Sequence, residues 1–373
     1  MAETNVAYSS NLRNQLWSQE ILGEKLKETV SGNFIGDNSI ICPETDLERS
    51  AGDEITIQLA LNLTGIGTGE GVAVDGNEEA ASYKDDTMRI NELTHSMLVP
   101  TKRSVSQKRV GFSHEDTSLD LLSKWFKARA DIWFFNTLAG NTANSFTSDG
   151  ITFSSTSEKL LATGNNTAAA PSTNRVVRAG GAANDESITS TDVFTLKLID
   201  VAVEKARTAV PYIAPIPVMG REMYVCFISE EQLTDLIRDT SSPVQVVDIA
   251  LNELAGGQDI KDSTLVTARG FAYRETLLVA NTRVANGVNS STGATISNVR
   301  RAIFCGQHAA HMAYVGAGYG EGSLYEEYKD GGKLKQISGN VIGGLKKTQY
   351  TIAGTAEDFG VITISTYAAP HTS

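Results

Sequence analysis

The sequence has little cysteine, few aromatic residues, a deficit of positive charge and no long apolar run. Three cysteines occur in 373 residues, and Cys42, Cys226 and Cys305 each stand beside apolar neighbours. An odd number of distant cysteines in such surroundings predicts buried, reduced thiols. No stretch approaches the roughly 20 apolar residues that cross a bilayer, so we expect no membrane helix. The N-terminus lacks a charged start followed by an apolar run, so we expect no signal peptide and a cytoplasmic site of synthesis.

Basic residues are outnumbered by acidic ones. The chain has 32 Lys and Arg against 44 Asp and Glu, which gives a formal net charge of −12. Proteins that bind nucleic acid tightly present a basic face, because phosphate contacts supply most of the affinity. The acidic balance therefore argues against a DNA-binding factor.

Aromatic residues make up 7% of the chain, whereas glycine occurs 33 times. With abundant Ser, Thr and Asn, this composition favours β-rich structure with long loops over a densely helical enzyme. Hydrophobic residues at 41% and charged residues at 20% still predict a sizeable packed core. The length is that of about two or three structural units.

The first fifty residues do not have the pattern of a domain. Residues 15–30 place Trp17 and four aliphatic side chains along one helical stripe, and an irregular segment follows. We therefore predict that residues 1–50 form an arm that packs on another surface.

Residues 51–112 predict a long β excursion. Apolar and polar residues alternate strictly over residues 54–64, which indicates a strand whose apolar face includes Ile55, Ile57 and Leu59. A glycine-rich tip containing Gly67 and an Asp75-Gly76 turn signal follow, and a second extended segment returns over residues 87–99. Because an isolated ribbon is marginally stable in water, we expect this one to lean on a neighbour.

The strongest predicted helix covers residues 114–139. Acidic and capping residues begin it, Gly140 ends it, and two adjacent apolar stripes run along it. A rod of this kind, roughly 33 Å long, would act as a spine. A second helix is predicted over residues 191–209. Between the two, residues 141–190 are poor in large apolar side chains and predict an irregular surface insertion with a short hairpin near residues 151–153.

The remainder predicts short strands that alternate with loops and small helices. We expect helices over residues 230–238 and 306–314, and strands over residues 223–228, 263–268, 273–280, 299–305, 341–352 and 359–366.

Two glycine-rich runs invite a nucleotide-binding interpretation, but neither meets the requirements. In the run from Gly65 to Gly71 the third glycine of the dinucleotide fingerprint is missing and no helix follows. In the run from Gly339 to Lys346, Leu345 stands where a phosphate loop needs lysine. We interpret both runs as flexible hairpin tips.

Other chemistry-bearing groups favour structural roles. His308 and His311 could face one another on a helix with Cys305 a turn away, but a zinc site lacks a further ligand, so we predict ordinary helix packing. The acidic residues between Asp75 and Asp86 favour solvated or interface positions over acid–base chemistry. The basic run, Lys102, Arg103, Lys108 and Arg109, could contact DNA but more readily meets acidic groups on another subunit. We predict no catalytic residue, cofactor or metal site.

The order of these elements resembles the α+β Hong Kong 97 capsid fold (HK97-like). Several segments are similar to the major capsid protein family typified by coliphage N4, and nearly the whole chain takes part. The similar segments are residues 17–20, 46–57, 76–79, the spine with Trp125 and Asp131, and residues 301–306, 343–347 and 357–361.

The resemblance implies a non-enzymatic subunit of an icosahedral shell around the double-stranded DNA of a tailed bacteriophage. Residues 1–50 would be the arm and residues 51–112 the extended loop (E-loop) that lies over a neighbouring subunit. Residues 113–229 would form the peripheral domain, residues 230–330 the axial domain, and residues 331–373 strands that return to the peripheral domain. The expected interface residues are Ile55, Ile57, Leu59, Gly67, Glu78, Glu79, Lys102, Arg103, Lys108, Arg109 and Trp17.

The same resemblance implies partners and a location. The chain would associate with itself in hexamers and pentamers, with portal and scaffolding proteins, and optionally with a decoration protein. Packaged DNA would touch the acidic wall by weak, non-specific contacts, and no membrane would be involved. Assembly would occur in the host cytoplasm and the product would be the virion capsid. The alternatives are a bacterial nanocompartment shell, a phage tail component and a hydrolase.

Overall fold

The computed structural model describes residues 31–44, 54–102, 104–109, 113–143, 146–148, 151–153, 168–218, 221–239, 270–273, 275–314, 323–352 and 354–371. The helix predicted within the arm, including Trp17, and the strand predicted at residues 263–268 lie outside these residues. The chain divides into two compact units. Among the described residues, the first unit holds those from 93 to 128 and from 323 to 341, and the second holds the rest.

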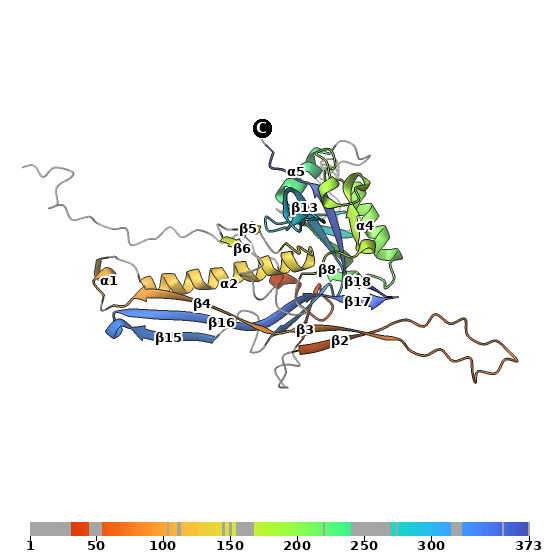
Figure 1. Ribbon diagram of the computed structural model, residues 1–373, viewed down its shortest axis with the longest axis horizontal. Helices are drawn as coiled ribbons and strands as arrows, with labels where there is room; N and C mark the ends of the chain where they lie inside the picture. Colours follow the sequence, from red (N-terminus) through yellow and green to blue (C-terminus); the bar gives the residue numbers. More distant parts are fainter. Residues whose placement is uncertain are drawn as a thin grey trace, which may run out of the picture. The chain divides into compact units, whose positions relative to one another are not determined.

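The first unit combines strands with the first half of a long helix (Figure 1). β15 (Ser323–Lys329) and the beginning of β16 (Leu334–Lys347) form an antiparallel hairpin around the 3₁₀ turn Asp330–Gly332. β4 (Asn91–Pro100) also pairs with β16, and α1 (Val105–Arg109) precedes the helix. Val99, Leu122 and Ile337 are buried together, so strand β4, helix α2 and strand β16 share a small core.

The long helix α2 (His114–Leu138) confirms the predicted spine. Ser113 caps its start, where its hydroxyl accepts a hydrogen bond from Asp116 N at 3.3 Å. Gly140 ends it with a φ of +61°. Asn141 N donates to Asn136 O and Gly140 N to Thr137 O, which is the paired C-terminal bonding of a Schellman motif. The predicted stop signal therefore acts as expected.

A sheet of eight strands organises the second unit. Its main order is β10 (Gly270–Tyr273), β11 (Thr276–Ala280), β9 (Arg221–Ile228), β13 (Thr295–Cys305), β19 (Val361–Tyr367) and β7 (Val176–Arg178). β12 (Asn286–Val288) pairs with β13, and β8 (Ile216–Val218) with β9. Alternate residues of one strand face opposite sides of a sheet. Accordingly, Val225 and Phe227 of β9 join one buried cluster while Tyr224 and Cys226 join another.

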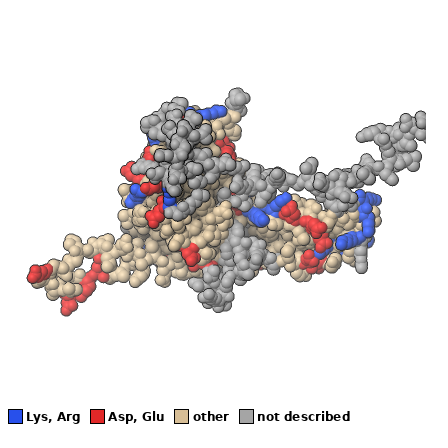
Figure 2. All heavy atoms as spheres, turned by 180° about the vertical axis from the view of Figure 1, so that it is seen from behind, with Lys and Arg blue, Asp and Glu red and all other residues tan. Residues whose placement is uncertain are grey.

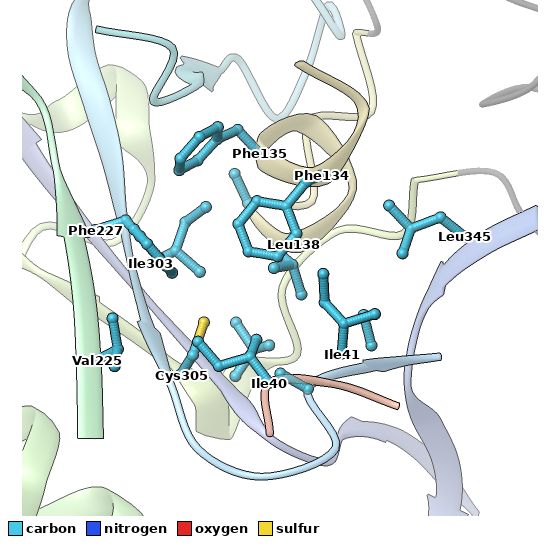
Figure 3. Packing of buried hydrophobic residues seen from close by; sticks show 14 of the residues in the cluster. Ile40, Ile41, Phe134, Phe135, Leu138, Val225, Phe227, Ile303, Cys305 and Leu345 are labelled. Carbon is cyan, nitrogen blue, oxygen red and sulfur yellow. The ribbon is translucent and has the colours of Figure 1, made fainter. Parts of the chain in front are cut away.

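Both faces of this sheet are covered within the second unit. On one face the end of α2 brings Phe134, Phe135 and Leu138 against Phe227 and Ile303 (Figure 3). On the other face α4 (Leu196–Thr208) buries its apolar stripe, and α5 (Glu230–Arg238) adds Leu236. This double burial explains why residues 223–228 of β9 and 302–305 of β13 are continuous apolar runs rather than alternating ones.

The remaining strands of the structure are short. They are β1 (Ile41–Glu44), β2 (Glu54–Ala60), β3 (Tyr83–Arg89), β5 (Phe146–Ser148), β6 (Ile151–Phe153), β14 (Ala310–Tyr314), β17 (Gln349–Ile352) and β18 (Thr355–Asp358). β14 pairs with β1 on one side and with the end of β16 on the other. The β5–β6 pair confirms the hairpin predicted near residues 151–153. Where the sequence predicts one strand at residues 273–280, β10 and β11 form a hairpin.

Three predictions about local structure are wrong. Residues 310–314 form strand β14 and not a helix, because their small side chains are buried alternately against the main core and against Met88. The run from Gly339 to Lys346 lies inside strand β16 and not at a hairpin tip. A Cβ atom on Gly339 would lie 2.6 Å from Cε2 of Phe126, so glycine here permits close packing of the helix on the strand.

The third correction concerns residues 141–190. Val176–Arg178 forms β7, which pairs in parallel with β19, and Val177 contributes to the core beneath α4. Part of the predicted surface insertion therefore completes the sheet. The strands from residues 270–305, predicted as axial, pair directly with β9 and β19, which were predicted as peripheral or C-terminal. The five-part division of the chain stays a prediction.

A buried ion pair lies within the second unit, at the end of α2 that belongs to this unit. Asp131 and Arg283 side chains are both fully buried, and Arg283 Nη1 lies 2.8 Å from Asp131 Oδ2. The other carboxylate oxygen of Asp131 accepts a hydrogen bond from Ser31 N at 2.9 Å. Asp131 thus joins the helix, the segment before β1 and the loop after β11.

We predict that the substitution Asp131→Ala lowers the free energy of unfolding by about 3–5 kcal/mol, because it removes the carboxylate that faces the buried Arg283 guanidinium. Urea denaturation measures the change. Asp120→Ala, which removes the exposed i,i+4 pair with Lys124, is the matched control and should cost at most about 0.5 kcal/mol. Equal effects of the two substitutions would contradict the structural role given to Asp131.

Candidate functional site

The β2–β3 ribbon and the segment that joins its strands are the clearest candidate for a functional surface. The two strands pair in antiparallel register from Glu54↔Arg89 to Ala60↔Tyr83. Residues 61–82 continue beyond them as a loop that extends away from the ends of both strands (Figure 1). The ribbon confirms the alternation predicted from the sequence.

Apolar contacts hold the base of the ribbon to the rest of the second unit, to which it belongs. Ile55 and Met88, which face each other across the ribbon, are buried with Ala313 of β14. Ile57 packs against this cluster while Leu59, two residues further, is half-buried. Coverage of the ribbon by its own chain therefore decreases from its base towards the loop.

A buried ion pair reinforces the base. Lys346 Nζ of β16 contacts Asp86 Oδ1 of β3 and donates to Thr87 O at 2.8 Å. Gln349 N donates to the second carboxylate oxygen of Asp86 at 3.1 Å. Both charges are mostly shielded from water, with side-chain exposures of 14% for Lys346 and 8% for Asp86. The ribbon is thus fixed in orientation as well as covered.

The loop has internal order although it is exposed. Glu79 accepts hydrogen bonds from Thr64 N at 2.7 Å and from Gly65 N, which ties the two sides of the loop together. These backbone hydrogen bonds hold the pKa of Glu79 below its ordinary value. Glu78 accepts a bond from Gly76 N at 2.8 Å. Glu78 and Glu79 therefore hold the backbone of the loop in shape and also give the loop negative charge.

Two turns near the tip of the loop require glycine. Val72 N donates to Gly69 O, and Asn77 N donates to Val74 O. The third residue of each turn is a glycine with positive φ, +83° at Gly71 and +90° at Gly76, as a type II turn demands. The Asp75-Gly76 turn signal is confirmed.

The loop exposes apolar side chains that its own chain does not cover. Leu63, Ile66, Val72 and Val74 are 56–104% exposed, and nearly every residue from 61 to 82 is exposed. The same loop has four acidic residues and no Lys or Arg, and Figure 2 shows the red acidic groups at its end. An apolar and acidic surface of this kind matches a protein partner better than nucleic acid.

The predicted basic residues belong to the first unit. Lys102, Lys108 and Arg109 are all exposed, the last two at the end of α1. Arg103 and Trp17 lie outside the described residues. Gly67 has a φ of +78° and open space around it, and Glu78 and Glu79 are exposed with it in the loop. Ile55 is already covered within its own chain. The interface role of the predicted residues stays a prediction.

Sequence reasoning missed two polar groupings at the base of the ribbon. One is the Asp86–Lys346 pair. The other joins Cys42, Glu44 and His311, where His311 Nδ1 lies 2.9 Å from Glu44 Oε1. Burial, followed by the charges of Glu44 and Asp37, raises the pKa of the Cys42 thiol to about 11. His311 lies on strand β14 and His308 precedes it with a φ of +52°, so the predicted helical arrangement of the two is wrong.

The cysteine predictions are confirmed for two residues of three. Cys226 and Cys305 are free and fully buried, and burial raises the pKa of both thiols. Cys42 is free and half-buried. In the described part of the chain, no helix is long and apolar enough to cross a membrane.

Comparison with known proteins gives a consistent result. The phage capsid protein family matches residues 5–370 of the chain. The capsid of Ralstonia phage GP4 is 27% identical with a TM-score of 0.77, and the match covers 100% of both chains. The cyanophage Pam1 capsid is 21% identical with a TM-score of 0.70, again over 100% of both chains. None of the curated proteins matches.

A more distant likeness supports the fold. The head structure of Helicobacter pylori bacteriophage KHP40 is 13% identical with a TM-score of 0.64 and is matched over 98% of this chain and 99% of that one. The α+β, Hong Kong 97-like fold predicted from the order of elements is confirmed. Membership of the coliphage N4 type stays a prediction.

We predict that Lys346→Met loosens the ribbon, because it leaves the buried Asp86 carboxylate without its counter-ion. The free energy needed to open the ribbon should fall by about 3 kcal/mol. This fall should appear as faster amide hydrogen exchange in β2 and β3. The double variant Asp86→Asn/Lys346→Met should recover part of this protection. Arg89→Ala removes an exposed ion pair with Glu54 on the same ribbon. It should change the opening free energy measured by hydrogen exchange by at most about 1 kcal/mol. Unchanged exchange in Lys346→Met would refute the anchoring role.

Proposed function

Because the chain belongs to the phage capsid protein family, we propose that it is the major capsid protein of a tailed bacteriophage, whose copies form the icosahedral shell around a double-stranded DNA genome. The family fixes the coarser statement that this is a structural protein of a phage capsid. The observation that carries the finer proposal is the loop of residues 61–82. It exposes apolar side chains on an ordered ribbon, and a second copy of the chain can cover them.

The geometry of such a contact favours rings. The loop is one part of the chain and we assign the surface that receives it to another part, so copies can join head to tail in a heterologous contact. Heterologous contacts produce closed rings when the rotation between copies closes. Hexamers and pentamers are rings of this kind, and the glycines at the loop tip allow the small differences in bend that the two require.

Charge supports one choice of receiving surface. Loop residues 61–82 have four acidic and no basic side chains, whereas the exposed Lys102, Lys108 and Arg109 lie around α1. We propose that these basic residues of one copy, together with Arg103, contact the acidic loop of a neighbouring copy. Complementary charge of this kind selects the partner and the orientation more than it adds affinity.

The remaining roles follow from the same proposal. A shell that fills with DNA needs a portal, and its copies need a scaffolding protein if they do not nucleate correctly alone. The net charge of −12 suits a wall along which packaged DNA slides, with weak and non-specific contacts. A decoration protein is an optional further partner. Assembly in the host cytoplasm and residence in the virion complete the proposal.

We predict that shortening the loop prevents shell assembly without unfolding the subunit. Replacement of residues 62–81 by Asn-Gly joins Leu61 to Ser82, whose backbones already bond at 2.9 Å, and keeps the Asp86 anchor. Electron microscopy should show no shells, while circular dichroism and thermal melting of the soluble subunit should stay as in the wild type. Normal shells from this variant would refute the role of the loop.

We also predict that reversing the basic charges blocks assembly and that a second reversal restores it. Lys102→Glu/Lys108→Glu/Arg109→Glu should abolish shells because like charges then meet across the contact. Adding Glu70→Lys/Asp75→Lys/Glu78→Lys should recover them, and light scattering during assembly measures both. Reversal of Lys127 and Lys197, exposed lysines on helices α2 and α4, serves as the control. Failure of the second reversal to rescue subunits that still fold would reject this pairing.

A further inference from the structure

Three metal-binding side chains converge on one face of the sheet formed by β1 and β14. The two strands are parallel, with Cys42 paired to His311. Glu44 lies two residues after Cys42, so the period of a strand places both on the same face. One ligand atom from each side chain lies within 4.8 Å of the other two. We propose that Cys42, Glu44 and His311 bind a divalent metal ion of the zinc class.

The ligand types suit that ion. Zn²⁺ takes thiolate, imidazole and carboxylate ligands at about 2.0–2.3 Å in tetrahedral geometry, which separates ligand atoms by about 3.3–3.8 Å. Here the greatest separation is at most 4.8 Å, and His311 Nδ1 lies 2.9 Å from Glu44 Oε1. The separations between ligand atoms therefore need to change by at most about 1.5 Å, within the reach of side-chain rotation. Carboxylate and thiolate also supply the negative charge that balances the cation.

The site is open to solvent on one side and has a further imidazole beside it. His311 is buried, whereas Cys42 and Glu44 are partly open to solvent, so an ion can enter. The His308 ring stacks beside that of His311 with centroids 6.0 Å apart, and His308 N donates to Ser39 O at 3.0 Å. Water or His308 can complete the tetrahedron. A site with three protein ligands and one exchangeable position is a recognised zinc arrangement.

The neighbouring positive charge does not oppose the ion strongly. Lys346 is paired with His311 across β14 and β16, but its ammonium group contacts the Asp86 carboxylate. The bound ion would link β1 to β14 and so fix the segment that leads from the arm into the core. This site does not depend on the shell function, and a chain that forms no shells could still bind the metal.

The test uses the untagged full-length chain, reduced and freed of metal by chelator, and titrates it with Co²⁺ as a spectroscopic substitute for Zn²⁺. We expect one equivalent to bind with a thiolate-to-cobalt charge-transfer absorption, which Zn²⁺ then removes. Cys42→Ser should abolish that absorption. Glu44→Gln and His311→Gln should each weaken binding at least about tenfold, as loss of even an outer partner does. Zn²⁺ should also raise the melting temperature of the wild type.

Controls separate a lost ligand from a lost fold. His371→Gln removes a histidine paired with Asp235, away from these strands, and should bind Co²⁺ as the wild type does. Each variant is melted without metal, and Cys42→Ala replaces Cys42→Ser if the latter melts early. Absence of a thiolate absorption in the wild type would overturn the proposal. So would its persistence in the Cys42 variants, or equal affinity in all variants that fold.

Discussion

The ion pair between Asp86 and Lys346 sets the direction of the ribbon on which the exposed loop stands. A ribbon held by apolar contact alone could slide or rotate, because apolar contacts have little directional preference. The buried carboxylate adds direction, since it must meet both Lys346 Nζ and Gln349 N. The loop therefore starts from a base that is fixed in position and direction.

One part of the chain buries its own apolar surface, whereas the loop of residues 61–82 leaves its apolar side chains exposed. The eight-stranded sheet is covered on both faces by helices of its own chain, so its apolar surface is buried without a partner. The loop has the opposite character, with Leu63 and Ile66 exposed on ordered backbone. An exposed apolar surface of this kind on a folded subunit marks a site where a partner binds. Self-assembly requires such a site.

The sequence predicted the elements whose signals are local and periodic. The alternation that includes Ile55 and Ile57, the helix that ends at Gly140 and the Asp75-Gly76 turn all follow from neighbours in the chain. The prediction from sequence failed where segments far apart in the chain decide the local structure. Residues 310–314 look helical from their alanines and become a strand because β1 and β16 lie on either side. Asp86 and Lys346 are 260 residues apart, and no local pattern marks them as partners. The same holds for Cys42 and His311, whose pairing depends on the register of two strands.

The energy of the proposed loop contact explains why a lattice would suit it better than a pair of copies. Burial of one exposed Leu, Ile or Val side chain contributes roughly 1.5–3 kcal/mol. Association of two proteins costs about 4–15 kcal/mol in lost freedom and ordering. Four such side chains at the loop therefore do little more than offset that cost in an isolated dimer. In a ring each copy both gives a loop and receives one, so the last copy to enter makes two contacts while it loses its freedom once. Single contacts stay weak enough to reverse, and closed assemblies become stable, as the formation of a regular shell requires.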